Sequence, residues 1–383
     1  MPSQHALLSA SSAHRWLNCT PSALLQEANT SSEAAEQGTA AHALAEWKLT
    51  RALGYPEQTY PASHFIDEEM EEATDDYVSF VLEKRREAQE HCADVCTLVE
   101  ERLDFSEWVV DGFGTGEAVI IAEPTLHIID LKYGQGVLVS AHDNPQMRLY
   151  ALGALATYGV LYDIEQVSMS IFQPRRENFD TEVVSARELY AWADKVVRPQ
   201  AELAAHGQGE FKAGTWCQFC AKRATCRARA EANLALAKDS FKAATDLTDA
   251  EVSEVLLKAT EFKSWISDVE TYALAEAVNK GHKWPHMKLV AGRSRRCFTD
   301  EHAIKETLAA ANIEGFTKEV LLGITDMERL LGKRRFSELL GDYVTKPQGK
   351  PCLVDVNDKR EELVTDIASE FTSKPLERKL SWQ

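Results

Sequence analysis

The hydrophobic pattern of the chain changes period several times, and each change marks a different kind of element. Apolar residues recur at helical spacing in the alanine-rich stretch SSEAAEQGTAAHALAEWKLTRAL (31–53), and again over 75–93. From Cys96 the pattern becomes short β-branched runs broken by glycine and proline, CTLVEERLDF and then AVIIAEPTLHIIDLKY. We therefore expect a helical N-terminal part followed by three strands of one sheet.

The pattern then alternates between helix and strand. Residues 145–158 (PQMRLYALGALATY) return to helical spacing, and residues 166–174 (QVSMSIFQP) alternate as a fourth strand. A helix over 186–206 leads into a cysteine-rich segment. A long helix should begin after Thr248, because Thr248-Asp-Ala-Glu251 matches a capping box.

Beyond Gly281 the signals are shorter and indicate a small α+β appendage. We expect a strand over 286–291, helices over 300–311 and 326–340, and a terminal strand over 351–356. A chain of 383 residues exceeds one comfortable core, so we predict a larger domain, 1–240, and a smaller one, 241–383.

The composition is that of a soluble globular protein, with 44% hydrophobic and 27% charged residues. No apolar run is long enough to span a membrane, and the N-terminus lacks the basic and apolar regions of a signal peptide. We therefore expect a cytoplasmic protein that does not bind membranes.

The formal net charge of −18 argues at first against a nucleic-acid partner, because phosphate binding rests on lysine and arginine. The charges are unevenly distributed, however. Residues 67–76 (DEEMEEATDD) are strongly acidic, whereas residues 211–230 contain five lysines or arginines and no acid, and residues 281–299 are also basic. Each basic segment is either a solvated face or part of a DNA-binding track.

Two carboxylates and a lysine form the strongest local signal. Asp130 and Lys132 end an apolar strand, where residues two apart point to the same face. A preceding antiparallel strand would bring Glu117 opposite Asp130. These groups suit Mg²⁺ or Mn²⁺ and the hydrolysis of a phosphodiester, although an acid-x-Lys triplet alone also occurs as a surface ion pair. Glu100 or Glu101, on the strand before, could supply a further carboxylate, but we expect both at a solvent-facing strand end.

Two further pairs flank this set. His42 ends a GT-x-x-H sequence and has Glu46 one helical turn later, while Gln146 and Tyr150 have the same spacing on the helix after the DLK strand. The order GT-x-x-H, G-x-x-x-G-E, IIDLKYG, Q-x-x-x-Y resembles the motif order of RecB-like PD-(D/E)XK nucleases.

This resemblance implies an α/β fold with a PD-(D/E)XK restriction-endonuclease-like core, in which helices flank a central mixed sheet. It also implies site roles by position: His42, Glu117 and Asp130 as ligands of the divalent ion, Lys132 as the group that assists the attacking water, and Gln146 and Tyr150 as supports of the site or of the DNA backbone. The family usually has aspartate where this sequence has Glu117. The longer side chain leaves the metal geometry at that position open.

The implied activity is Mg²⁺- or Mn²⁺-dependent hydrolysis of DNA. The whole chain looks like a phage or prophage protein family of such nucleases, which points to an exonuclease in phage DNA replication or recombination. DNA is then the partner, and a phage single-strand binding protein, an annealing protein or a helicase would be further partners. Arg293, Arg295 and Arg296 are either DNA contacts or part of a solvated turn.

The cysteines suggest a second metal centre. Cys217-x-x-Cys220-x5-Cys226 places three thiols within ten residues, and Cys19 is a candidate fourth ligand far upstream. The arrangement resembles that of iron–sulfur RecB-like nucleases of the AddB and CRISPR-associated types, which implies a [4Fe-4S] cluster. Structural Zn²⁺ uses similar ligands and remains the alternative.

Two other classes of function compete with an active nuclease. One is a DNA-binding module whose active site is dead, which would gain support if Glu117 did not face Asp130. The other is a structural or interaction protein held together by a four-cysteine zinc site, which would require the strand that ends in Asp130-Leu131-Lys132 to be exposed and unrelated to His42.

Overall fold

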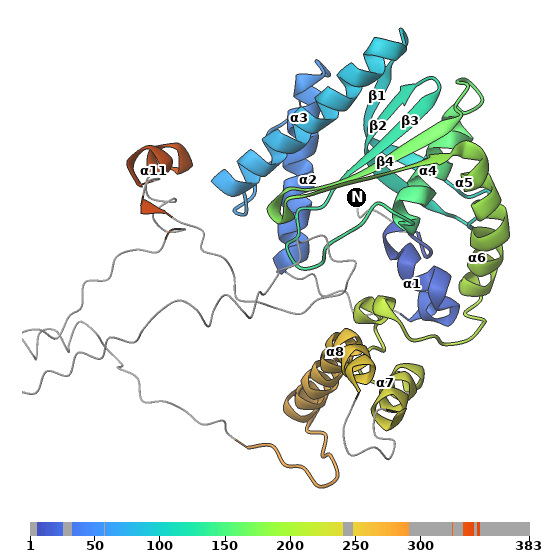
Figure 1. The fold of residues 1–383 in the computed structure, drawn as a ribbon, viewed down its shortest axis with the longest axis vertical. Helices are drawn as coiled ribbons and strands as arrows, with labels where there is room; N and C mark the ends of the chain where they lie inside the picture. Colours follow the sequence, from blue (N-terminus) through green and yellow to red (C-terminus); the bar gives the residue numbers. More distant parts are fainter. Residues whose placement is uncertain are drawn as a thin grey trace, which may run out of the picture. The chain divides into compact units, whose positions relative to one another are not determined.

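The computed structural model describes residues 6–25, 33–56, 58–239, 248–290, 324, 332–340 and 343–344 (Figure 1). The helix expected over 300–311 and the strand expected over 351–356 lie outside these residues. So do the three arginines proposed as DNA contacts, Arg293, Arg295 and Arg296, and two of the cysteines, Cys297 and Cys352.

Five strands form one mixed sheet in the order β1-β2-β3-β4-β5. They are β1 (Cys96–Asp104), β2 (Phe113–Ala122), β3 (Thr125–Leu131), β4 (Gln166–Gln173) and β5 (Asn178–Ser185). β3 and β4 run parallel, whereas the other neighbouring strands run antiparallel. The parallel pair needs a crossover connection, which α4 (Pro145–Tyr158) provides. The four strands and the crossover helix expected from the sequence are confirmed.

The structure also describes the following helices. In chain order they are η1 (Ala10–Ser12), α1 (Ala13–Asn18), η2 (Thr20–Leu24), α2 (Glu33–Ala52), α3 (Glu68–His91), α5 (Ala186–Trp192), a π-helical turn η4 (Ala193–Val197), α6 (Arg198–Ala205), η5 (Thr215–Phe219), α7 (Arg227–Asp239), α8 (Asp249–Lys280) and α11 (Lys333–Leu340), together with η3 (Pro174–Arg176) between β4 and β5.

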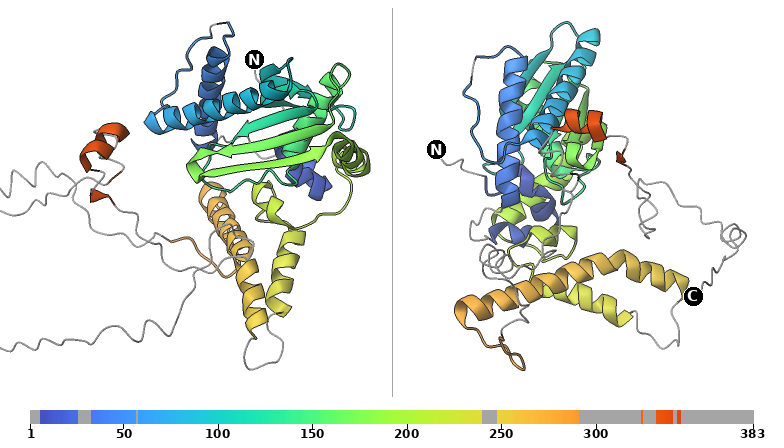
Figure 2. Two further views of the ribbon diagram at one scale, coloured as in Figure 1. Left: turned by 45° about the horizontal axis from the view of Figure 1, so that its top comes forward. Right: turned by 90° about the vertical axis from the view of Figure 1, so that its left-hand side faces the viewer.

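The sheet has a hydrophobic core on each face. Alternate residues of β2 illustrate this arrangement: Ile120 packs with Leu49 and Tyr77 of α2 and α3, whereas Val119 packs in the core that α4 covers. Figure 2 shows α2 and α3 together on one side of the sheet. Because both faces are covered, five consecutive apolar residues of β2, from Ala118 to Ala122, are all buried.

Local sequence signals account for where several helices begin. Asp67 caps α3 by accepting a hydrogen bond from the backbone N–H of Met70, so this helix begins earlier than the expected residue 75. The capping box at α8 is confirmed, since Thr248 and Glu251 bond to each other's backbone N–H groups. The helical stretch expected over 186–206 contains a π turn directly before Pro199, which lacks a backbone N–H to donate.

Strand β5 was not predicted. Its residues do alternate, but Phe179 and Val183 are each 57% exposed, so the apolar positions of this edge strand do not mark a buried face. The turn that starts the strand is also hard to recognise, because Glu177 adopts the left-handed backbone region with φ of 50° without being glycine.

Two compact units can be distinguished, one made of residues 1–243 and 261–318, the other of residues 244–260 and 319–383. The division expected at residue 240 stays a prediction about domains. The strand expected over 286–291 is wrong for the residues that the structure describes, because 286–290 form a turn and an irregular segment. Of the helix expected over 326–340, the structure describes Lys333–Leu340 as α11.

Across the described ranges, no helix combines the length and the apolar character needed to cross a membrane.

Candidate functional site

The six residues to which the sequence resemblance assigns site roles come from four elements and lie in one polar cluster. His42 is on α2, Glu117 on β2, Asp130 and Lys132 at the end of β3, and Gln146 and Tyr150 on the first turns of α4. The β2–β3 register pairs Ala118 with Ile129, so the next pair of residues along the strands is Glu117 and Asp130. The antiparallel juxtaposition expected from the sequence is confirmed.

Lys132 links Asp130 to α4. Its Nζ atom lies 2.7 Å from the Oδ2 atom of Asp130, and Nζ also donates a hydrogen bond of 3.2 Å to the Oε1 atom of Gln146. The Gln146 amide donates in turn to the Tyr150 hydroxyl at 3.0 Å. Asp130 is only 2% exposed, so this ion pair is shielded from solvent on the carboxylate side.

Glu117 connects the sheet to α2. Its Oε1 atom lies 2.9 Å from Nδ1 of His42, and its Oε2 atom accepts a hydrogen bond of 2.5 Å from the backbone N–H of Leu131. The imidazole is about one-third exposed, whereas the carboxylate is mostly buried. Both Glu117 oxygens are therefore held in place, one by a helix and one by the neighbouring strand.

The sequence around α4 explains how Gln146 and Tyr150 reach the site. Asn144 accepts hydrogen bonds from the backbone N–H of Gln146 and of Met147, and Pro145 occupies the first turn, so the helix starts at the strand end. Gly114 on β2 allows the Tyr150 ring to approach, because a Cβ atom there would lie 2.5 Å from the ring.

Burial and charge shift the pKa values of this cluster. The Glu117 carboxylate raises the pKa of His42 to about 9, so the imidazole is a cation at neutral pH. Burial raises the pKa of Asp130 to about 6, with the Lys132 ammonium opposing the shift. The pKa of Lys132 is raised although burial opposes it, because the carboxylates of Asp130 and Glu117 stabilise its charge.

The cluster has the donor types that a hard divalent cation requires, but its groups are engaged with one another. His42 is paired with Glu117, and Asp130 with Lys132. Among the residues described, no three histidine, cysteine, aspartate or glutamate side chains already surround one point as metal ligands. Binding an ion through His42, Glu117 and Asp130 would require the His42 proton to leave and its side chain to turn.

The position of Glu100 differs from the one that we expected. We expected it with Glu101 at a solvent-facing strand end, but Glu100 is partly buried, and burial followed by the Glu117 charge raises its pKa to about 7. His42 and Glu46 also influence this pKa, which places both near the Glu100 carboxyl group. Glu101 differs, because its carboxylate accepts a hydrogen bond from Tyr158 on α4.

A backbone irregularity separates these two glutamates. Glu100 has φ of 51°, in the left-handed region, and the alternation of β1 changes there. Leu98 before it and Leu103 after it both pack in the core beneath α4, although they are five positions apart and a regular strand would place them on opposite faces. The hydrophobic pattern of β1 gave no sign of this change.

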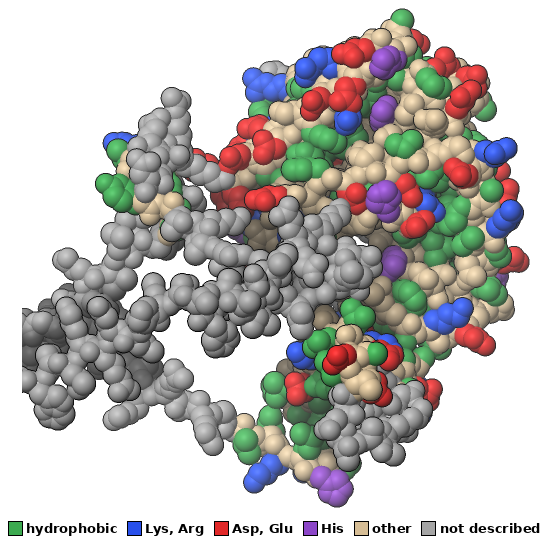
Figure 3. All heavy atoms as spheres, in the orientation of Figure 1, with side chains coloured by type: hydrophobic (Ala, Val, Ile, Leu, Met, Phe, Trp, Pro, Cys, Tyr) green, Lys and Arg blue, Asp and Glu red, His purple; other side chains and the backbone are tan. Residues whose placement is uncertain are grey.

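The acidic segment 67–76 forms the N-terminal end of α3, where acidic side chains gather in Figure 3. Several of them have local partners: Glu69 pairs with Arg175, and Lys48 pairs with both Glu71 and Asp75. Carboxylates at a helix N-terminus are also favoured by the helix dipole. This segment therefore has a structural explanation.

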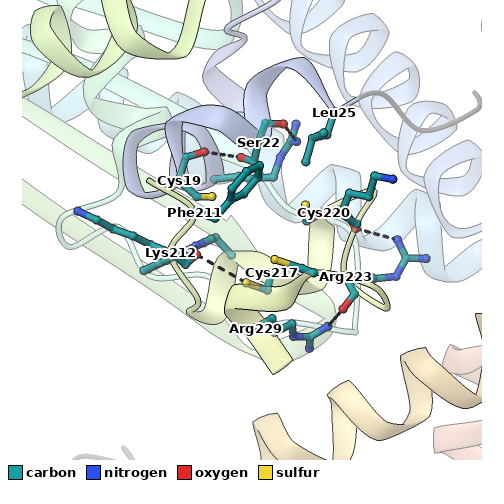
Figure 4. A pocket seen from close by; sticks show the side chains of 13 residues that line it. Cys19, Ser22, Leu25, Phe211, Lys212, Cys217, Cys220, Arg223 and Arg229 are labelled. Atoms are coloured by element: carbon teal, nitrogen blue, oxygen red, sulfur yellow. Dashed lines mark hydrogen bonds between the residues drawn. The ribbon is translucent and has the colours of Figure 1, made fainter. Parts of the chain in front are cut away.

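The four cysteines proposed as ligands line a single pocket. Cys19 follows α1, Cys217 lies in η5, and Cys220 and Cys226 lie in the loop before α7. Figure 4 shows Cys19, Cys217 and Cys220 around this pocket. Cys19 therefore lines the same pocket as the three distant cysteines, as expected, but among the described residues no three cysteines already surround one point as metal ligands.

Contacts between the N-terminal segment that contains Cys19 and the segment that contains the other three cysteines stabilise this pocket. His14 on α1 bonds to the Thr215 hydroxyl at 3.1 Å, and its ring meets the Trp216 ring edge-on with centroids 5.7 Å apart. The Thr20 hydroxyl donates a hydrogen bond of 2.6 Å to the carbonyl of Gln208. These contacts bring the start of the chain beside the cysteine loop.

The donor set of this pocket fits a thiolate-bound metal centre. All four thiols are free, and Cys19, Cys217 and Cys220 are buried. Burial raises the pKa of Cys217, and the neighbouring Cys220 and Cys226 raise it further. The pocket wall is rich in cations that would compensate the negative charge of four thiolates: Arg15, Lys212, Lys222, Arg223 and Arg229.

Among solved structures, the chain is similar to one described as "Crystal structure of SSO0001". The two share 12% sequence identity over 56% of this chain and 96% of that chain, with a TM-score of 0.23. A family model described as "Protein of unknown function (DUF2800)" matches residues 5–361, which is most of the sequence, and the chain therefore belongs to this family.

Proposed function

We propose that this protein is a Mg²⁺- or Mn²⁺-dependent deoxyribonuclease of the PD-(D/E)XK type that acts as an exonuclease in phage DNA replication or recombination. The observation that carries the proposal is the single cluster of six residues from α2, β2, β3 and α4. Three contacts join residues of these motifs: His42 with Glu117, Asp130 with Lys132, and Gln146 with Tyr150.

In this proposal His42, Glu117 and Asp130 hold the divalent ion. The bound ion would polarise the phosphoryl oxygen and lower the pKa of a water molecule. The two carboxylates suit this role, because Mg²⁺ and Mn²⁺ prefer oxygen ligands, and the imidazole nitrogen suits the softer Mn²⁺ better than Mg²⁺. Glu117 can supply a ligand atom while its other oxygen keeps the bond to the Leu131 backbone.

Lys132 acts as a cation and not as the base. Its pKa is raised by Asp130 and Glu117, so it carries a proton at neutral pH and cannot accept one from water. The ammonium group instead orients the attacking water and stabilises the negative charge that develops on the phosphate. Gln146 restricts the position of this group through the hydrogen bond to Nζ, and Tyr150 restricts Gln146.

We also propose that Cys19, Cys217, Cys220 and Cys226 hold a [4Fe-4S] cluster, with Zn²⁺ as the alternative occupant. Four free thiols around one pocket support either centre. The role is structural, because the ligands join the start of the nuclease domain to its end. Binding free energy would then contribute to folding.

The test is cleavage of DNA labelled at either end by purified protein with Mn²⁺ or Mg²⁺. Cleavage that requires the ion and disappears in Lys132→Ala supports the proposal. Binding of DNA without cleavage by the wild-type protein would favour a DNA-binding module with a dead site. Neither binding nor cleavage, in protein that still retains zinc, would favour a structural or interaction protein.

A further inference from the structure

Arg229 is a buried cation in the wall of the four-cysteine pocket. Its side chain is fully buried, and a guanidinium group in such a place needs anionic partners. It has two on α8: Nε donates to Glu261 at 2.8 Å, and Nη1 donates to Asp268 at 2.6 Å. Nη1 also donates to the carbonyl of Arg223 at 3.1 Å.

One nitrogen of this guanidinium remains unused. The Nη2 atom of Arg229 is buried and has no hydrogen-bond partner within the described part of the chain. Arg229 lines the same pocket as Cys217, Cys220 and Cys226. A centre bound by four thiolates carries net negative charge, because the thiolates outweigh the charge of the metal. Such a centre is the kind of group that an unused guanidinium N–H would stabilise.

The backbone ties Arg229 to one of the proposed ligands. α7 begins at Arg227, directly after Cys226, and the N–H of Ala230 donates to the carbonyl of Cys226 at 3.0 Å. Any shift of Cys226 therefore moves the first turn of α7, and Arg229 with it. Arg223, between Cys220 and Cys226, also reaches α8, with Nε lying 3.3 Å from Asp268.

The two carboxylates that accept hydrogen bonds from Arg229 lie on one face of α8. Glu261 and Asp268 are seven residues apart, which is two helical turns. The portion of α8 from residue 261 onward belongs to the same compact unit as α7. The contact to Arg229 is therefore internal to that unit.

From these contacts we propose that Arg229 is a positioning residue that couples occupancy of the four-cysteine centre to the docking of α8 on α7. This inference rests on the proposed metal centre. Occupancy fixes Cys226 and the start of α7, which fixes Arg229 and so the charge-assisted bonds to Glu261 and Asp268. Because linkage is reciprocal, docked α8 in turn retains the centre.

The test compares metal-loaded protein with protein stripped by a chelator. Metal and sulfide content are measured first, followed by hydrogen–deuterium exchange. We expect exchange over residues 261–280 to become roughly tenfold faster or more when the centre is removed, as for loss of a charge-assisted hydrogen bond. Exchange in β3 serves as the reference for global unfolding.

The matched pair of variants is Arg229→Met and Arg227→Met. Both replace an α7 arginine, but Arg227 is 88% exposed, and its ion pair within the described part of the chain is with Glu231, at 3.8 Å. In loaded protein, Arg229→Met should show the fast α8 exchange and should lose metal to a chelator several times faster, whereas Arg227→Met should match the wild type. Asp268→Asn, whose side chain is 22% exposed, tests the same link if Arg229→Met does not fold.

The outcomes separate the two proposals. A protein that binds neither zinc nor iron has no four-cysteine centre, which overturns both. A protein that binds metal but shows unchanged α8 exchange on stripping, relative to β3, keeps the centre and overturns the coupling. Equal behaviour of Arg229→Met and Arg227→Met in the loaded state would overturn the role of Arg229 as well.

Discussion

The ammonium group of Lys132 lies 2.7 Å from the carboxylate of Asp130, at the end of a strand where one partner is buried and the other partly exposed. Breaking the pair by removing Lys132 would destabilise the fold through Asp130, because burying a carboxylate without a partner costs free energy. Lys132, the partly exposed partner, can be replaced without leaving an unpaired charge of its own in the interior. This asymmetry makes Lys132 the residue to change first.

We expect Lys132→Ala to lower the rate of DNA cleavage by about 100-fold or more, because it removes a cation that stabilises developing charge. Lys84→Ala is a matched control, since Lys84 is similarly exposed and pairs with Glu87 at 2.8 Å away from the cluster. The measurement is the initial rate with Mn²⁺, with circular dichroism to check the fold. Comparable cleavage by the two variants would contradict the role proposed for Lys132.

The pH dependence of the metal-free protein follows from His42. The folded-state pKa of about 9 lies above the ordinary value of 6.5, so the folded state binds more protons between these values. The His42–Glu117 pair should stabilise the fold fully below pH 6.5, and this contribution should disappear as pH rises through 9. We expect Tm to fall over this window, and to fall less in His42→Gln.

The proton on the His42 imidazole competes with the metal for the ring nitrogen, since a ligating imidazole must be neutral. The affinity for Mn²⁺ should therefore rise with pH up to about 9, with close to one proton released per ion at pH 7.5. Calorimetry in buffers of different ionisation enthalpy measures this release. Binding without any proton release would show that His42 is not a ligand.

Glu100 should show a trade-off between stability and activity. Burial raises its pKa to about 7 in the folded state, so ionising it costs stability as pH rises from 4.5 to 7, and the cost is fully present above 7. Glu100→Gln should raise the Tm of metal-free protein at pH 8 and lower the cleavage rate, because the carboxyl group lies near Glu117 and His42.

Glu101→Gln is the comparison for this variant. Glu101 bonds to Tyr158 on the α4 side, so its substitution should cost a little stability and leave cleavage close to the wild-type rate. If instead Glu100→Gln cleaved at the wild-type rate and only Glu101→Gln were impaired, the placement of Glu100 in the functional cluster would be wrong.

Much of the fold could be predicted because its signals are local. The apolar runs of β1 to β4 and the helical spacing of α4 are properties of neighbouring residues, and the structure confirms them. β5 escaped prediction because Phe179 and Val183 are exposed, so its pattern does not mark a core. Hydrophobic periodicity predicts which face of an element is buried. This prediction fails for an edge strand whose apolar residues are exposed to solvent.

The residues of the candidate site were likewise predicted only where the signal is local in the sequence. Asp130 and Lys132 were found because residues two apart on a strand share a face, and His42 was found through the GT-x-x-H sequence and its resemblance to the RecB-like motif order. Glu100 was assigned to solvent because a single left-handed residue reverses the alternation of β1, and residue types do not reveal that backbone angle. Arg229 was missed because its partners, Glu261 and Asp268, lie on another helix and nothing in the sequence pairs them.

Two glycines in the motifs should respond in opposite directions to alanine. At Gly114 a Cβ atom would lie 2.5 Å from the Tyr150 ring, so Gly114→Ala should destabilise by about 1–3 kcal/mol and slow cleavage by displacing that ring. At Gly38, within α2, nothing lies within 4 Å, so Gly38→Ala should stabilise by up to about 1 kcal/mol. Denaturant melts measure both.

Cys19 provides the last prediction, because in the sequence it lies almost two hundred residues before the other three cysteines of its pocket. A ligand so distant closes a very long loop, so losing it should cost both the metal and the folding free energy that the metal contributes. We expect anaerobically purified wild-type protein to be brown, with iron and sulfide near cluster stoichiometry, and Cys19→Ser to lose colour and Tm together.

Cys92→Ser is the control for this variant. Cys92 is a partly exposed free thiol whose Sγ atom lies 3.3 Å from the Asp94 carbonyl, and it does not line the four-cysteine pocket. Its substitution should leave metal content unchanged. Zinc without sulfide in the wild type would keep the structural role and replace the cluster by an ion. Full metal content and an unchanged Tm in Cys19→Ser would remove Cys19 from the ligand set, whichever metal is bound.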